Sequence, residues 1–481
     1  MTSLTPPVHQ SPFLGPRGIP QATHTLSPWQ KVFLILAGAG LCSAFFLGPW
    51  QNVIFYINLT FSVIFLIGSI YRLYLVDLSL RVRHSAYADT HAQDPPQWPT
   101  YTIQIPLYRE ARAIIPLSRA LNQLDYPKDR LTIQLLIEED DHETMQAAQQ
   151  ANLPEHFKII PIPYSQPRTK PKACNVGLAQ ANSDYLVIYD AEDRPEPDQL
   201  KKAVRAFSKL PPAVACIQAK LNFYNARHNL ITRLFAAEYA VWFDLCLPAL
   251  AFLDAPIPLG GTSNHFRLDI LKQVKGWDEF NVTEDCDLGL RLYQMGYRTQ
   301  ILPSTTWEEA TSELPIWIRQ RSRWVKGYVQ TYLVHMRHPF RLLTRLGIKN
   351  FLHFQLLIGS AILGQLLNPI YWTLVTIWLL AIFGGAAWMP ALTQFQHQLS
   401  QFYPLPVFLM AATCLFIGNF CLLYSCALAC CIRTFFDLAK YTILMPFYWF
   451  IMGIAAWKGT LQLIHRPHFW EKTEHHRTGT S

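Results

Sequence analysis

Long apolar segments gather at the two ends of this 481-residue chain. Near the N-terminus, segments 32–50 and 53–75 contain a single charged residue, Arg72. Each is long enough to cross a hydrocarbon layer of about 30 Å. Four further candidates follow at about 351–367, 368–385, 405–430 and 437–457. The pair Asn368-Pro369 suggests a tight turn between two of them. The sequence therefore predicts a multi-pass membrane protein with six spans.

Basic residues lie where the chain leaves these segments, which is typical of cytoplasmic flanks. They are Arg72, Arg81 and Arg83 after the second segment, and Arg337, Arg341, Arg345 and Lys349 before the third. The intervening region should therefore face the cytosol from the inner (plasma) membrane. Arg433 and Lys440 disagree, because six spans would place their loop outside. Since basic residues collect at the lipid bilayer, the net charge of +8 does not indicate a nucleic-acid partner.

The distribution of apolar and basic residues divides the chain into five parts. Residues 1–30 are rich in Pro, Ser and Thr, which predicts a disordered tail. The other parts are two membrane helices (31–76), a cytoplasmic catalytic domain (95–335), an interfacial helix with about four membrane helices (336–460) and a cytoplasmic tail (461–481). Cysteines in the middle part suit a reducing cytosol.

Short β-rich runs alternate with helical stretches in the middle region. The strands are expected at 101–105, 132–137, 158–162 and 185–189, with helices at 110–124, 143–151 and 173–181. This alternation predicts a parallel sheet with helices on both faces. Ligands of such sheets bind beyond the carboxyl ends of the strands.

Carboxylates follow two of these strands. The run EEDD occupies 138–141, and Asp190, Glu192 and Asp193 follow the fourth strand. Clustered carboxylates repel one another unless a cation lies between them. Oxygen ligands suit Mg²⁺ or Mn²⁺, and Mg²⁺ favours one or two carboxylates together with substrate phosphates. The acids therefore suggest a metal and a nucleotide diphosphate, although a solvated acidic turn would show the same pattern.

Two further motifs follow. Thr283 is a plausible N-cap of a helix that ends at Gly296, which puts Glu284 and Asp285 in its first turn. An ionised carboxylate there can serve as a general base, although acids are also common as helix caps. Gln320, Arg323 and Trp324 form Q-x-x-R-W. Its arginine could stabilise a leaving phosphate. The alternative, which has no catalytic role, is a basic helix on the membrane surface.

Taken in order, these motifs resemble those of processive family 2 glycosyltransferases of the cellulose synthase type, over about residues 30–465. The segments IPLYRE at 105–110 and KPKACN at 170–175 resemble further family elements. DAEDRP, GGTSNHF and WEKTEHH suggest the bacterial XagB-like branch. The resemblance implies an α/β nucleotide-sugar-binding (GT-A-type) catalytic domain inserted between transmembrane helices, with Mg²⁺ or Mn²⁺ as cofactor.

The resemblance also implies roles for matching residues. Asp285 would be the general base beside Glu284, and Trp324 would contact the acceptor sugar. Asp190 and Glu192 would hold the metal, with Asp193 as an alternative ligand because the family usually has Asp at position 192. The expected nucleotide-sugar contacts are Pro106, Tyr108, Glu110, Glu139 or Asp140 at the uracil, Lys172 near the diphosphate, Asp190, Gln320 and Arg323.

The implied activity is inverting transfer of a hexose from a UDP-sugar to a growing polysaccharide. UDP-glucose and a β-glucan such as cellulose are the first expectation, with the polymer leaving through the membrane helices and accessory export or regulatory proteins as possible partners. One alternative is a non-processive enzyme that charges a lipid acceptor with one sugar. Another is a transporter whose soluble domain only senses nucleotide sugar.

Overall fold

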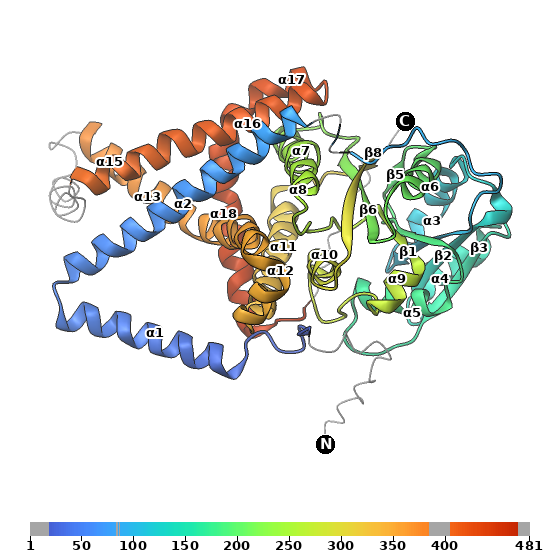
Figure 1. Cartoon of the computed structure of the whole chain (residues 1–481), viewed down its shortest axis with the longest axis horizontal. Coiled ribbons are helices and arrows are strands. Elements are labelled where there is room, and N and C mark those ends of the chain that lie inside the picture. The colour runs from blue at the N-terminus through green and yellow to red at the C-terminus, as the bar shows by residue number, and fades with distance from the viewer. Residues whose placement is uncertain (1–18, 83–84, 86, 384–404, 470–481) are drawn as a thin grey trace.

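The computed structural model describes residues 19–82, 85, 87–383 and 405–469. An α/β domain lies on one side, and the helices α2, α13, α15 and α16 extend away from it (Figure 1). Eight strands make one sheet. They are β1 (Tyr101–Leu107), β2 (Leu131–Glu138), β3 (Phe157–Ile162), β4 (Tyr185–Ile188), β5 (Arg194–Pro195), β6 (Val214–Phe223), β7 (Asn264–Arg267) and β8 (Arg298–Glu308).

The sheet order is β3-β2-β1-β4-β7-β6-β8-β5. β1 to β4 pair in parallel, as the sequence predicts. The prediction of a parallel sheet is wrong beyond them, because β7 runs antiparallel to both neighbours and β5 antiparallel to β8. The Ser263 N–H donates to Ile188 O at 2.8 Å, so the loop before β7 lies where β4 ends. β7 therefore starts at that edge and runs back.

Helices cover both faces of the sheet. In β2, Leu135 and Ile137 pack with α3, whereas Leu136 packs on the other face with α5, as the two-residue period of a strand requires. The helices are α3 (Ile114–Asn122), α4 (His142–Gln150), α5 (Lys170–Gln180), α6 (Gln199–Lys209), α7 (Leu230–Ala240), α8 (Leu247–Phe252), α9 (Leu268–Gln273), α10 (Glu284–Gln294) and α11 (Leu314–His335). A π-helix, η3 (Val241–Cys246), joins α7 to α8, and short 3₁₀ turns are η1 (Ala111–Ala113) and η2 (Lys128–Arg130).

The remaining helices lie outside this domain. They are α1 (Pro28–Leu47), α2 (Trp50–Arg81), α12 (Pro339–Phe354), η4 (Gln355–Gly359), α13 (Ser360–Phe383), α15 (Leu405–Thr413), η5 (Cys414–Gly418), α16 (Asn419–Ile432), α17 (Phe436–Ala439), η6 (Lys440–Leu444) and α18 (Met445–His465). By length and composition, six helical segments of the described chain could cross a membrane. One of the six, Leu230–Phe252, is 78% buried inside the protein.

The predicted turn at Asn368-Pro369 is wrong, because α13 runs through both residues. A proline is tolerated in a membrane helix where neighbouring groups satisfy the freed backbone. Here α18 packs against the pyrrolidine ring: a Cβ on Gly453 would lie 2.5 Å from Pro369 Cγ. The segments 351–367 and 368–385 therefore belong to one continuous run of helix. This holds up to Phe383, where this stretch of described residues ends.

The predicted last span, 437–457, is largely α18, which packs along α11 (Figure 1). Near its start, Tyr448 accepts a hydrogen bond from Arg321 at 2.8 Å. Just after its end, the Lys326 ammonium donates to Phe469 O at 2.6 Å. Both ends of α18 thus contact the catalytic domain. Apolar side chains on one face of α18 pack against the rest of the protein, while Phe447, Ile454 and Leu461 are exposed on another face.

The position of Arg433 resolves the conflict noted in the sequence. Its guanidinium pairs with the buried Asp244 of η3, and Asp437 pairs with Arg227 at 2.8 Å. The turn between α16 and α17 therefore lies on the side of the catalytic domain.

Residues 19–30 of the predicted tail at 1–30 are structured. Residues 1–18 and 470–481 lie outside the described residues, but residues 19–27 pack on the domain. The Ala22 N–H donates to Asp278 Oδ2 at 2.6 Å, and Arg337 donates to Gln21 O at 2.8 Å. Ser27 then caps α1, which begins at Pro28.

Candidate active site

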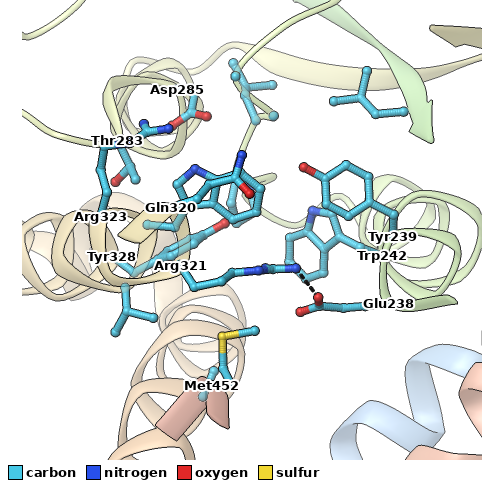
Figure 2. A pocket seen from close by; sticks show the side chains of 18 of the residues that line it. Glu238, Tyr239, Trp242, Thr283, Asp285, Gln320, Arg321, Arg323, Tyr328 and Met452 are labelled. Carbon is cyan, nitrogen blue, oxygen red and sulfur yellow. Dashed lines mark hydrogen bonds and ion pairs between the residues drawn. The ribbon is translucent and has the colours of Figure 1, made fainter. Parts of the chain in front are cut away.

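One cavity of about 620 Å³ brings together the motifs of the catalytic domain. Pro106, Tyr108 and Glu110 line it at the end of β1, and Asp190 and Glu192 after β4. The cavity is also lined by Glu284 and Asp285 of α10 and by Gln320, Arg323 and Trp324 of α11. Figure 2 shows how α10 and α11 direct Asp285, Gln320 and Arg323 toward a common space.

An aromatic and cationic wall forms the end of the cavity near β1. The Arg168 guanidinium lies over the rings of Tyr108 and Tyr164, at 4.9 and 5.3 Å from their centroids. The same side chain pairs with Asp140 at the surface. Such a wall can receive the flat face of a nucleobase. Sequence reasoning missed Arg168, since its only signal is a basic residue shortly before the KPKACN segment.

The carboxylate at the end of β2 differs from the predicted one. Glu138 lines the cavity and is buried, whereas Glu139 and Asp140 are exposed and do not line it. Glu138 is the last residue of β2, and successive strand side chains point to opposite faces. The acidic run alone could not reveal which of its members faces the ligand.

Asp190 and Glu192 are the acids after β4 that reach the cavity. Asp193 is turned into the protein, where Oδ2 accepts hydrogen bonds from the Asp190 N–H, at 2.8 Å, and from the Thr262 hydroxyl. Burial raises the pKa of Asp193 well above its ordinary value, and Asp190 and Glu192 raise it further. Asp193 thus shapes the turn that presents Asp190, and the structure does not support it as a ligand.

The donor set fits a divalent cation. Glu308, at the end of β8, also lines the cavity and was not predicted. Burial raises the pKa of Glu308, and the neighbouring Asp193, Asp190 and Glu192 raise it further. Among the described residues, no group of three or more His, Cys, Asp or Glu converges into a complete ligand set. Two carboxylates that need donor phosphates to complete the shell are what Mg²⁺ or Mn²⁺ commonly uses.

The lysine in the cavity is Lys170, not the predicted Lys172. The Lys170 ammonium pairs with Asp190 and donates to Gly261 O at 2.7 Å. Lys172 is buried behind the cavity wall, where it donates to Pro163 O at 2.7 Å and lies 3.5 Å from Glu138 Oε2. Residues two apart on a helix point about 200° apart, so only one of them can face the cavity.

Replacing the two lysines should therefore have different effects. Lys170→Met should weaken binding of a nucleoside diphosphate about 10–100-fold, the worth of a hydrogen bond to a charged group. Lys172→Met should leave binding near wild type but lower the free energy of unfolding by about 1–3 kcal/mol, because Glu138 and the carbonyls of Pro163 and Ser165 lose a buried donor. Calorimetric titration with UDP and thermal unfolding of both variants measure this. Equal losses of binding would contradict the assignment.

The first turn of α10 carries Glu284 and Asp285. Burial raises the pKa of Glu284 to about 8, with the Asp285 charge as a second cause, and burial raises the pKa of Asp285 to about 6. A Cβ on Gly261 would lie 3.4 Å from Asp285 Oδ2, so the loop before β7 passes close to this carboxylate. Asp285 is therefore an ionisable group with a pKa near neutrality inside the cavity.

The opposite side of α10 is anchored by a buried charge cluster. Asp287 accepts hydrogen bonds from Arg291 Nε at 2.6 Å and from His335 Nε2, on α11, at 2.8 Å. Arg291 also donates to Gly276 O at 2.7 Å. The cluster ties the helix that carries Asp285 to the helix that carries Gln320, Arg323 and Trp324.

Removal of Asp287 should destabilise the protein strongly. We expect Asp287→Ala to lower the free energy of unfolding by about 3–5 kcal/mol, because Arg291 would remain buried without its carboxylate. Thermal unfolding of the detergent-solubilised chain measures the loss. Asp269→Ala, at an exposed position in the first turn of α9, is the matched control. A loss no larger than that of the control would show that the cluster does not hold α10.

The Q-x-x-R-W residues lie together on the cavity wall. Arg323 lies within electrostatic reach of Glu284, Asp190 and Asp285. Trp324 packs edge-on against Phe235, with centroids 6.0 Å apart, and lies beside Tyr239 at 6.2 Å. Aromatic rings therefore line the same cavity as the general-base candidate Asp285, and such rings can pack on the apolar face of a sugar.

A second charged pair lies deeper in the cavity. Arg321 pairs with Glu238 of α7, as the dashed line in Figure 2 shows, and Glu238 also accepts from Tyr448 of α18 at 2.6 Å. The sequence contained no sign of this pair or of its contact with Tyr448, because the three residues come from distant segments. It joins the catalytic domain to α18.

Beyond this pair the cavity continues between helices that are long and apolar enough to cross a membrane. The lining residues there include Phe65, Gly68, Ser69 and Arg72 of α2, Ser360, Ile362, Gly364 and Asn368 of α13, and Asn419, Leu422 and Ser425 of α16. Most are small or apolar, with a few amides and hydroxyls. A single cavity therefore connects the carboxylates of the α/β domain with the helices that extend from it.

Comparison with known proteins adds independent findings. Residues 185–456, more than half of the chain, match the family described as glycosyl transferase family group 2. The probable glycosyltransferase YdaM of Bacillus subtilis is 28% identical over 308 residues, which are 60% of this chain and 70% of that protein. The probable glucomannan 4-beta-mannosyltransferase 15 of Arabidopsis thaliana is 29% identical over 48% of this chain and 44% of that protein.

Two further matches are another relative found by sequence and a solved structure. The beta-monoglucosyldiacylglycerol synthase of Synechocystis is 26% identical over 57% of this chain and 58% of that protein. The chain thus spans about half the length of this relative and of the Arabidopsis one. A solved structure, the mannosyltransferase PcManGT of Pyrobaculum calidifontis in complex with GDP-Man and Mn²⁺, has a TM-score of 0.49 and 17% identity, over 85% of this chain and 99% of that one.

Proposed function

This chain belongs to glycosyl transferase family group 2, and we propose that it is an inverting hexosyltransferase whose acceptor lies between its membrane helices. The predicted GT-A-type fold is confirmed. One observation carries the proposal: the cavity that begins at the strand ends passes Asp285 and continues to α2, α13 and α16. A donor from the cytosol and an acceptor from the membrane side would meet at Asp285.

The donor would be a nucleotide diphosphate sugar, with UDP as first choice. Its base would lie against Tyr108 and Arg168. Asp190 and Glu192 would hold Mg²⁺ or Mn²⁺, which when bound supplies positive charge to the leaving diphosphate. Lys170 and Arg323 approach the same acids and would add donors to the phosphates.

Asp285 would act as the general base. An acceptor hydroxyl oxygen attacks the anomeric carbon of the donor sugar, and its proton passes to the Asp285 carboxylate. The bond from the anomeric carbon to the diphosphate oxygen breaks, and its electrons leave with the diphosphate. Attack from the side opposite the leaving group inverts the anomeric configuration. Trp324, which lines the same cavity as Asp285, would stack on the acceptor sugar.

A growing β-glucan is the proposed acceptor, and its translocation through the membrane helices would follow. The aromatic surface at Trp324, the amides along the cavity and the relative named as a glucomannan mannosyltransferase support this choice. A bound polymer would lie along the cavity and move by one sugar after each transfer.

A lipid acceptor is the second candidate, and the arrangement of the helices favours it. Leu230–Phe252 is buried in the domain and both ends of α18 contact it. That leaves four of the described apolar segments for crossing the membrane: α1, α2, the path through α13, and α15 to α16. The catalytic domain and the turn at Arg433 would then share the cytoplasmic side of the plasma membrane. A cavity lined there by only three of these helices suits a lipid better than an enclosed channel.

The deciding experiment separates the products. The full chain in lipid vesicles with Mn²⁺ would receive radiolabelled UDP-glucose, UDP-N-acetylglucosamine or GDP-mannose, with Asp285→Asn as control. Label in high-mass polymer that the control lacks would establish a synthase, and glucanase digestion would give the linkage. Label in lipid alone would reject polymerisation and support the second candidate. Label in neither fraction, with any donor, would argue against both and revive the sensor-transporter alternative.

A further inference from the structure

Arg72 is a charged residue on the cavity-lining face of a membrane helix. Phe65, Gly68, Ser69 and Arg72 follow the i, i+3, i+4, i+7 spacing of one helix face, and all line the cavity. Arg72 is half-buried and is the last of the four toward the catalytic domain. Cys246 of η3 lies within electrostatic reach of Arg72 and also lines the cavity.

Arg72 differs from the other cationic residues of this cavity. Among the described lining residues these are Arg168, Lys170, Arg321 and Arg323. Arg168 pairs with Asp140, Lys170 with Asp190 and Arg321 with Glu238, while Arg323 faces the acids of the active site. Arg72 makes no hydrogen bond or ion pair with any residue that the structure describes. Its guanidinium therefore has its full set of donors available to a ligand.

A charge at this position needs an anionic partner. Charged side chains within membrane helices are costly, and those that occur face a protein interior or an aqueous cavity and mark ligand sites. A planar guanidinium matches the oxygens of a phosphate with two parallel hydrogen bonds. Lys170, Arg323 and a cation held by Asp190, all on the α/β domain, would bind the diphosphate of the donor. The anion at Arg72 would come from the membrane side.

We propose that Arg72 binds the phosphate of a lipid whose chain lies in the cavity along α2, α13 and α16. Ile358, Ile362 and Leu422 line the cavity beyond Arg72 and provide apolar contacts for an acyl or prenyl chain. This inference rests on the proposed function in one respect only, that the membrane end of the cavity is the acceptor end. The phosphate belongs either to a lipid-linked acceptor or to a phospholipid that seals the cavity.

The test measures lipid binding without any sugar donor. Purified full-length protein would be titrated with radiolabelled phosphatidic acid, a polyprenyl phosphate, and diacylglycerol as the phosphate-free match. We expect the two phosphate lipids to bind at least tenfold more tightly than diacylglycerol, and Arg72→Gln to abolish that difference. Arg72→Lys should keep part of it. Arg81→Gln, on the same helix and paired with Asp77 at the surface, should behave as wild type.

Three results would overturn the proposal. They are equal binding of diacylglycerol, unchanged phosphate preference in Arg72→Gln, and weaker UDP binding in that variant with lipid binding intact, which would assign Arg72 to the donor. A preference for polyprenyl phosphate would identify the source as an acceptor, and a preference for phosphatidic acid as a phospholipid. Asp285→Asn should bind lipid normally and transfer sugar at least about 10²-fold more slowly, so failure of the lipid site and failure of the transferase function are separable.

Discussion

Asp285→Asn should reduce sugar transfer about 10²–10⁴-fold while leaving nucleotide binding intact. Asparagine keeps the shape of the side chain and its approach to Gly261, but it cannot accept the proton of the acceptor hydroxyl. Steady-state transfer to the acceptor gives kcat, and calorimetric titration gives the affinity for UDP. Asp269→Asn, on the surface of α9, is the control. Transfer within tenfold of wild type would exclude Asp285 as the base.

The pH dependence of transfer follows from the same residue. Burial raises the pKa of Asp285 to about 6, and only the ionised carboxylate can take a proton. Activity should therefore be lost as the pH falls through about 6 and be retained above it. Glu284→Gln should keep this acidic limb in kcat/KM, because burial is the first cause of the shift. If the acidic limb moved by more than one pH unit in Glu284→Gln, its pKa would belong to the coupled pair of Glu284 and Asp285 rather than to Asp285 alone.

Asp190→Asn should reduce metal-dependent donor binding and transfer by about 10²-fold or more, since a bound cation contributes several kcal/mol to leaving-group stabilisation. Asparagine removes the charge that attracts the cation and also frees Lys170. Titration with UDP in the presence and absence of Mn²⁺ measures the effect, and wild type should lose the Mn²⁺-dependent part of its affinity on chelation.

Asp193→Asn is the matched variant three positions along. Its carboxylate accepts hydrogen bonds from the Asp190 N–H and Thr262 rather than lining the cavity. We expect it to lower the melting temperature more than it weakens the Mn²⁺ response. The assignment of Asp190 would be untenable if UDP bound equally well with and without Mn²⁺ in the wild-type protein, or if Asp193→Asn alone removed the metal response.

Several parts of the site could be predicted because they follow from local order along the chain. The apolar run before Asp190 had to be a buried strand, so the acids after it had to lie at a strand end. The N-cap and apolar spacing after Thr283 put Asp285 in a first helical turn. Those positions hold in the structure. The roles assigned to them still await the experiments above.

Other residues could not be chosen from the sequence. Lys170 and Lys172 have similar local surroundings, and only the packing of α5 against β1 and β2 decides which one faces the cavity. The run at 138–141 contains four acids, and the end of β2 determines that Glu138 is the one that lines the cavity. Arg321 and Glu238 are 83 residues apart, so no local pattern could pair them.

The sequence by itself determined that the chain has an α/β domain between apolar helices, with carboxylates at strand ends and in one helix turn, because hydrophobic period and residue type depend on near neighbours. Only the tertiary structure decided that β7 runs antiparallel, that α13 passes through Pro369 and that α18 packs along α11. Hydropathy indicates that a side chain avoids water, but burial in lipid and burial in protein remove it from water equally well. The contacts that distinguish them join residues far apart in the chain.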